Sequence, residues 1–195
     1  MSPKQFIPAG SDIAQVAIND IGHCYLFGGA RGLDGKGCAD CSGEVNFWIG
    51  AVWKLAIPGF GPGTYDGSVH GPSTMGWLGW QGQGVGSIDR SQVAAGDIPC
   101  WRTHMGIAIS NTEMVSGLNE STGVVRTPID GLISGEELIC LRLAVIGPGG
   151  ITLPVPVIGG ESQVPGITRD IAQQAQVLIR RRMMIRTIGR PGWRL

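Results

Sequence analysis

Residues 39–53 read ADCSGEVNFWIGAVW, a polar start followed by a run of aliphatic and aromatic residues. Helical spacing places the apolar side chains on one face, which predicts a buried helix that begins at Cys41 and packs its aromatic residues against a sheet. The apolar positions on that face are Val45, Trp48, Ile49, Val52 and Trp53.

Cys41 is the first candidate for chemistry because it lies at the predicted start of this helix. A helix N-terminus brings unpaired backbone N–H groups close to the sulfur and favours the thiolate, the form in which cysteine acts as a nucleophile. Gly43 and the glycines before Cys41 let other backbone approach an exposed sulfur. Such a nucleophile also needs an acid–base partner.

His104 is the best placed of the three histidines in the sequence. It precedes the apolar run Met105–Ile109, so we expect it at the start of a buried strand, a rigid platform from which its imidazole faces Cys41. His70 lies in a loose glycine-rich stretch, and His23 has no strand to fix it. A surface or core role is the alternative for each histidine.

The segments around this pair predict an α+β fold. A helix over 12–21, capped by Ser11 and ended by Gly22, comes first. Residues 58–86 are dense in Gly, Pro, Ser and Thr with aromatic residues between them, which predicts a long ordered excursion that walls a groove. Helices followed by clustered strands are typical of this fold class. The predicted antiparallel strands are residues 105–109, 113–115, 124–127 and 138–145.

The composition favours one loop-rich globular domain with an appendage. The chain has 195 residues, of which 33 are glycine and 12 are proline, while 43% are hydrophobic, so it can bury a core. It contains no apolar run of the about 18 residues that cross a bilayer, and no start typical of a secretion signal. Five cysteines do not predict a disulfide scaffold, so each thiol is considered individually. We expect Cys100 and Cys140 to be buried packing residues.

Four short motifs in order resemble the NlpC family of cysteine peptidases. The motifs are YLFGG at 25–29, DCSG at 40–43, GDIPCW at 96–101 and HMGIAI at 104–109, and the resemblance covers residues 11–145. It implies a papain-like NlpC fold, with the nucleophile helix packed on an antiparallel sheet. It also implies hydrolysis of amide bonds in the stem or cross-link peptides of bacterial peptidoglycan, without a cofactor or metal.

The resemblance assigns roles to individual residues. Cys41 is the nucleophile that attacks the carbonyl carbon, and His104 takes the thiol proton and returns it to the leaving amine. Tyr25 steadies the substrate or the oxyanion, with a core aromatic residue as the alternative. Asp40 and Ser42 contact substrate or cap the helix, and we expect capping for at least one of them.

The third catalytic position departs from the family pattern, which has His, Asn or Gln there. The motif spacing places Ser116 at this position, and its hydroxyl can orient the imidazole, with Asn119 or a backbone carbonyl as alternatives. The second departure is the length between Cys41 and His104. We expect deletion of residues 62–85 to alter which substrate is cut.

Three other interpretations compete with the peptidase. One is a metal site made by Cys38 and Cys41 with His23 and Cys24. The second is a structural tail or assembly component whose NlpC fold is weakly active or inactive. The third is an N-acetylmuramoyl-L-alanine amidase, which uses the same thiol chemistry on a different bond.

The domain organisation has three parts. Residues 1–146 form the peptidase domain, residues 147–166 a Gly/Pro-rich arm, and residues 167–195 a basic amphipathic helix. Residues 151–195 carry 7 basic and 2 acidic side chains, which fits docking to a protein assembly or an anionic surface and equally fits a solvated terminal helix; the pattern does not indicate nucleic-acid binding. By analogy, we expect a virion-associated or host-released enzyme of a bacteriophage tail or lysis system that acts on the cell wall.

Overall fold

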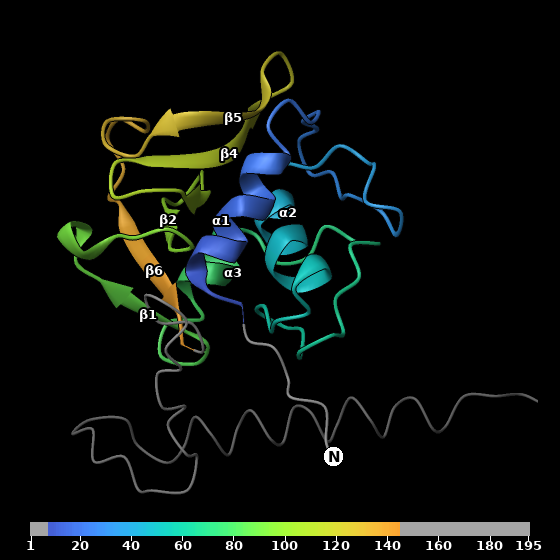
Figure 1. Ribbon diagram of the computed structural model, residues 1–195, viewed down its shortest axis with the longest axis horizontal. Helices are drawn as coiled ribbons and strands as arrows, with labels where there is room; N and C mark the ends of the chain where they lie inside the picture. Colours follow the sequence, from blue (N-terminus) through green and yellow to red (C-terminus); the bar gives the residue numbers. More distant parts are fainter. Residues whose placement is uncertain (1–7, 145–195) are drawn as a thin grey trace, which may run out of the picture. The chain divides into compact units, whose positions relative to one another are not determined.

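The computed structural model describes residues 8–144, which combine short helices with antiparallel sheets, so the α+β class is confirmed (Figure 1). The arm at 147–166 and the basic helix at 167–195 lie outside the described residues. Within 8–144, no helix is long and apolar enough to cross a membrane. The helices are α1 (Gly10–Asn19), α2 (Cys41–Asn46), η1 (Phe47–Val52), α3 (Thr74–Leu78) and η2 (Arg90–Gln92).

Helix α1 begins earlier than the sequence predicts. It starts at Gly10 and not after a Ser11 cap, because the Asp12 carboxylate accepts the Ala9 N–H at 2.7 Å and fixes the first turn. Gly10 permits close packing, since a Cβ there would lie 2.3 Å from the Ala95 carbonyl oxygen. Helix α1 packs its apolar face against β3, β4 and η1.

The predicted helix at Cys41 is confirmed at its start and differs at its end. After Asn46 the backbone widens into the π-helical η1, which changes the rotation between successive side chains. Trp48 and Ile49 remain fully buried, but Val52 is exposed, so its predicted place on the buried face is wrong. Helix α2 packs against β4 (Glu113–Asn119).

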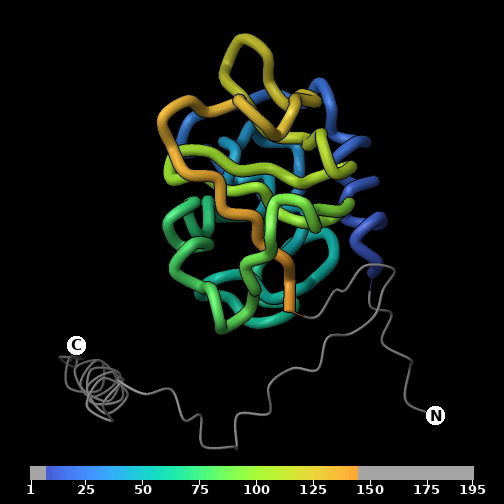
Figure 2. Tube along the Cα trace, turned by 90° about the vertical axis from the view of Figure 1, so that its left-hand side faces the viewer, coloured from blue at the N-terminus to red at the C-terminus, as the bar shows by residue number. Residues whose placement is uncertain are grey.

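The strands form two three-stranded antiparallel sheets. One has the order β1-β6-β2 and the other β3-β4-β5. A tight connection from β2 to β3 links them, because Gly106 N–H donates to Pro99 O and Ala108 N–H donates to Asp97 O. Figure 2 shows β6 running down the near face, with α1 at the right-hand edge. The bounds are β1 (Val85–Ile88), β2 (Ile98–Cys100), β3 (Ile107–Ala108), β4 (Glu113–Asn119), β5 (Gly123–Pro128) and β6 (Ile139–Leu143).

The excursion at 58–86 contributes to the core, which differs from the expectation of a groove wall alone. Tyr65 and Trp77 are almost fully buried. The Trp77 indole N–H donates to Asn46 Oδ1 at 2.8 Å, which joins α3 to the end of α2. The excursion is therefore built around the nucleophile helix, and its removal would also expose core surface.

Candidate active site

Cys41 is the first residue of α2, and the residue is only 7% exposed. The sulfur lies against the backbone N–H of Met105, which helps to stabilise a thiolate. Burial and the neighbouring Asp40 carboxylate outweigh this effect and raise the pKa of Cys41 to about 11. The backbone N–H groups of Cys41 and Ser42 at the helix start do favour the thiolate, as expected, but burial and Asp40 prevail, and the resting group is a neutral thiol.

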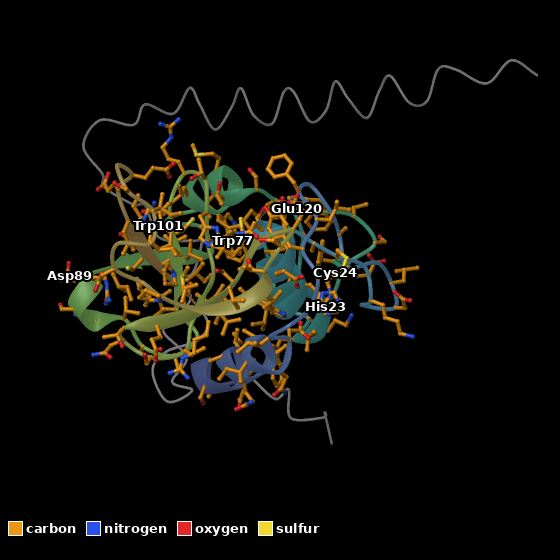
Figure 3. All side chains as sticks on the ribbon, turned by 90° about the horizontal axis from the view of Figure 1, so that it is seen from above. His23, Cys24, Trp77, Asp89, Trp101 and Glu120 are labelled. Atoms are coloured by element: carbon orange, nitrogen blue, oxygen red, sulfur yellow. A yellow bond between two sulfur atoms is a disulfide. The ribbon has the colours of Figure 1, made fainter. Side chains whose placement is uncertain are left out.

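His104 occupies the turn between β2 and β3, where Trp101 N–H donates to the His104 carbonyl at 2.7 Å. Its Nε2 lies 3.0 Å from the Ser116 hydroxyl of β4. The Trp101 ring, labelled in Figure 3, packs at a tilt beside the imidazole with 6.1 Å between centroids. Burial lowers the pKa of His104 to about 4, so the imidazole is neutral at pH 7.

Ser116, the residue predicted for the third catalytic position, therefore lies within hydrogen-bond distance of the His104 imidazole. A neutral imidazole has one ring proton, and with that proton on Nε2, donated to Ser116, Nδ1 keeps the lone pair that a base needs. The alternative Asn119 lies elsewhere, because its Oδ1 accepts hydrogen bonds from Ser121 and Thr122 in the β4–β5 turn.

Cys41 and His104 lie close in the fold without a hydrogen bond between their side chains. The sulfur contacts the amide of Met105, the residue that follows His104. Within residues 8–144, the only hydrogen bond of the His104 ring is the one to Ser116. The arrangement therefore corresponds to a neutral thiol and a neutral imidazole, with no preformed ion pair.

Asp40 connects three segments around Cys41. Its Oδ1 accepts hydrogen bonds from Ser42 N–H at 3.0 Å, Gly43 N–H at 2.9 Å and the Ser42 hydroxyl at 2.9 Å, so capping is confirmed. Its Oδ2 accepts the Gly28 N–H at 3.1 Å. Burial opposes ionisation, but these hydrogen bonds and one from His70 prevail and lower the pKa of Asp40 to about 2.

Both residues predicted to contact substrate beside Cys41 are buried. Asp40 is 7% exposed and Ser42 is 4% exposed. Asp40 is the helix cap, and the Ser42 hydroxyl supports that cap by donating to the Asp40 carboxylate.

Tyr25 lies next to the nucleophile helix. It forms a parallel bridge with Ala39, and its ring approaches Gly117 of β4, where an added Cβ would lie 3.0 Å from the ring. Burial, then the nearby Cys41 and Asp40, raise the pKa of Tyr25 to about 12, so its hydroxyl keeps its proton. A protonated phenol beside Cys41 can donate a hydrogen bond to a substrate oxygen.

His70 belongs to the site, although the sequence places it in a loose loop. Its Nε2 lies 2.8 Å from Asp40 Oδ1, and its Nδ1 lies 3.1 Å from the Gly71 carbonyl oxygen. Asn46 Nδ2 also holds the backbone by donating to the carbonyls of His70 and Pro72, at 2.9 and 2.8 Å. No local pattern in the sequence signals this contact, because it depends on the path of a long glycine-rich segment.

Cys24 and Cys38 form a disulfide, which decides the redox state that the sequence leaves open for these two cysteines. Figure 3 shows the disulfide at the labelled Cys24, close to His23. The bond removes two of the four thiolate or imidazole ligands that the metal interpretation needs. Within residues 8–144, no group of three or more metal-ligating side chains is present. Cys100 and Cys140 are buried free thiols, as predicted.

A charged cluster lies beneath the nucleophile helix. Glu44 is fully buried, and its Oε2 accepts a hydrogen bond from Arg31 Nη1 at 2.8 Å. The same nitrogen lies 3.0 Å from Asp20 Oδ2, which also accepts the Trp48 indole N–H. Burial raises the pKa of Glu44 to about 8 against the opposing effect of Arg31. This cluster ties the end of α1 and the loop before Cys41 to α2.

Comparison with known protein families and with curated proteins finds no match to this chain.

Proposed function

We propose that this chain is a thiol amide hydrolase of the NlpC type that cuts peptides of the bacterial cell wall. The observation that carries the proposal is the His104–Ser116 hydrogen bond of 3.0 Å in the turn next to the Cys41 sulfur. A nucleophile, a base and a group that orients the base are the three parts that this chemistry needs. The peptide substrate and the setting in a bacteriophage tail or lysis system rest on the motif resemblance.

The proposed reaction uses two half-reactions. As the thiol of Cys41 attacks the carbonyl carbon, its proton moves to Nδ1 of His104, and a tetrahedral intermediate forms. The C–N bond then breaks, the amine leaves with the proton from His104, and a thioester remains on Cys41. Water attacks the thioester, His104 accepts the water proton, and the Sγ leaves and recovers a proton as the acid product departs.

Purified peptidoglycan incubated with the full chain tests this proposal. Mass spectrometry of the soluble fragments is expected to show newly freed amino and carboxyl termini within stem or cross-link peptides. The variant Cys41→Ala supplies the background. Whole stem peptides released from the sugar would instead identify an N-acetylmuramoyl-L-alanine amidase, and absence of any thiol-dependent product would contradict hydrolysis.

A structural assembly component is the second candidate function. The low exposure of Cys41 and the absence of a hydrogen bond between its thiol and His104, among the residues described, favour this alternative. The presence of both Cys41 and His104 favours the enzyme, whereas Ser116 in place of His, Asn or Gln favours the structural alternative. The same incubation distinguishes them, because a purely structural protein releases no more fragments than Cys41→Ala does.

Ser116→Ala is expected to lower kcat for wall-peptide hydrolysis about 10-fold, because it leaves a buried ring nitrogen of His104 without its partner. The expected change in KM is small, since Ser116 is fully buried behind the imidazole. Ser87→Ala on the exposed part of β1 is the matched control and is expected to retain the wild-type kcat. An unchanged kcat in Ser116→Ala would mean that Trp101 alone orients the ring.

A further inference from the structure

We propose that His70 is a positioning residue that acts through Asp40: its imidazolium neutralises the capping carboxylate so that the Cys41 thiolate can form beside it. The inference deepens the proposed function and rests on it for its relevance to catalysis. The effect of His70 on the reactivity of the Cys41 thiol can be measured without substrate.

Hydrogen-bond geometry assigns the charge of His70. Its Nε2 faces an Asp40 oxygen at 2.8 Å, and its Nδ1 faces the Gly71 carbonyl oxygen at 3.1 Å. Both partners are acceptors, so both ring nitrogens must carry a proton, and the ring is an imidazolium. The hydrogen bond to Asp40 correspondingly raises the pKa of His70 above its usual value.

The imidazolium is held by the fold and reached by solvent. The Tyr65 hydroxyl donates to the Val69 carbonyl at 2.9 Å, and Asn46 donates to the carbonyl of His70, so the backbone is fixed to α2. The His70 side chain is 26% exposed, whereas that of Asp40 is 10% exposed. A proton can therefore exchange at His70 while the carboxylate remains in the interior.

His70 is the one positive charge among the titratable side chains that face Asp40 and Cys41 within the described part of the chain. Burial raises the pKa of Tyr25, Tyr65 and Cys100 to about 12, so these groups are neutral at pH 7. His104 is also neutral, because burial lowers its pKa to about 4. The facing groups, by element, are Tyr25 before α2, Tyr65 and His70 in the excursion, Cys100 in β2 and His104 before β3.

An unpaired Asp40 carboxylate would oppose ionisation of the adjacent thiol. A like charge within about 4–6 Å shifts a pKa by about 1–3 pH units, and each unit lowers the thiolate fraction 10-fold. The imidazolium of His70 opposes this effect while it keeps its proton. The influence of His70 on Cys41 should therefore be present at low pH and be lost as the pH rises through the pKa of His70.

The experiment measures the rate at which iodoacetamide alkylates Cys41 between pH 6 and 9, with the modified peptide identified by mass spectrometry. His70→Gln is expected to react about 10-fold more slowly than wild type at pH 6, and the ratio is expected to approach one at pH 9. Adding Asp40→Asn to His70→Gln should restore the rate at pH 6, because asparagine also caps a helix but has no charge. His23→Gln, a histidine near the disulfide, is the matched control and should follow wild type.

The outcomes separate the two proposals. Three results would each overturn the role of His70. The first is an equal alkylation rate for His70→Gln and wild type at pH 6. The others are a lowered rate that is the same at every pH and a lowered rate that Asp40→Asn does not restore. If His70→Gln does not fold, Asp40→Asn alone decides: because His70 offsets the carboxylate only while it is protonated, removal of the carboxylate must accelerate alkylation more at pH 9 than at pH 6. If alkylation follows the expected pattern but peptidoglycan is not hydrolysed, the proposed function is rejected and the role of His70 is retained. If peptidoglycan is hydrolysed but the alkylation ratios do not change with pH, the role of His70 is rejected and the proposed function is retained.

Discussion

Replacing His104 by glutamine is expected to lower kcat for wall-peptide hydrolysis about 10³-fold. General acid–base catalysis by a positioned side chain typically contributes about 10²–10⁴-fold, and glutamine cannot accept the thiol proton. Its amide has nearly the length of the imidazole and can still bond to the Ser116 hydroxyl, so the turn between β2 and β3 should keep its conformation. Steady-state kinetics on isolated wall peptides measures the change, and thermal unfolding checks the fold.

The pH profile gives this prediction a second readout. Because burial lowers the pKa of His104 to about 4, wild-type kcat/KM should hold from neutral pH down to about pH 5 and fall only as the imidazole becomes protonated. An imidazole with the ordinary pKa of about 6.5 would already be about 97% protonated at pH 5. The acid limb should be missing from the residual activity of His104→Gln. Retention of more than a tenth of kcat in this variant would argue against His104 as the base.

Local patterns in the sequence predict the start of the nucleophile helix, and the motif resemblance places Ser116 at the position that orients His104. Both depend on short-range features: Asp40 and Ser42 directly flank Cys41, and Ser116 follows His104 across one hairpin. The predicted strands after residue 104 are all present, with bounds shifted by a few residues, because short apolar stretches between turn residues identify a strand better than they identify its ends.

The features that sequence patterns miss are set by contacts between distant segments. His70 reaches Asp40 across 30 positions, and no periodicity reports where a glycine-rich segment returns to the core. The raised pKa of Cys41 depends on how completely β2 and the β2–β3 turn cover the sulfur. The Cys24–Cys38 disulfide likewise requires that the turn after Tyr25 lie beside Ala39, a pairing that spacing alone does not determine.

The hydrogen bonds that Asp40 accepts explain why the site tolerates this buried carboxylate next to Cys41. The carboxylate receives hydrogen bonds from the turn at Gly28, from the first turn of α2 and from His70 in the excursion. Each bond holds one wall of the site against the helix that bears Cys41. The carboxylate thus organises the site, and its electrostatic effect on the thiol is the disadvantage that a nearby cation offsets.

Replacing Arg31 by methionine is expected to lower the free energy of unfolding by about 3–5 kcal/mol at pH 9, the effect of leaving a buried charge without its partner. Arg31 is 4% exposed and bonds Glu44, Asp20 and the Gly35 carbonyl, while its guanidinium lies 4.7 Å from the Phe47 ring centroid. Methionine retains most of the apolar volume, so the variant removes mainly the charge and its hydrogen bonds.

The loss caused by Arg31→Met should depend on pH with a defined sign. Burial already raises the pKa of Glu44 to about 8, and loss of Arg31 raises it further, so the folded variant can avoid the unpaired charge by keeping Glu44 protonated. The destabilisation should therefore be smaller at pH 5.5, where Glu44 is protonated in both folded proteins, than at pH 9, where wild-type Glu44 is ionised beside Arg31, as measured by urea unfolding at both values. Adding Glu44→Gln should recover much of the loss, because the remaining side chain is neutral.

Arg126→Met, which breaks only the exposed pair with Glu113, is the matched control and should leave the unfolding midpoint unchanged. An equal loss at the two pH values would mean that Arg31 acts through packing and not through its charge.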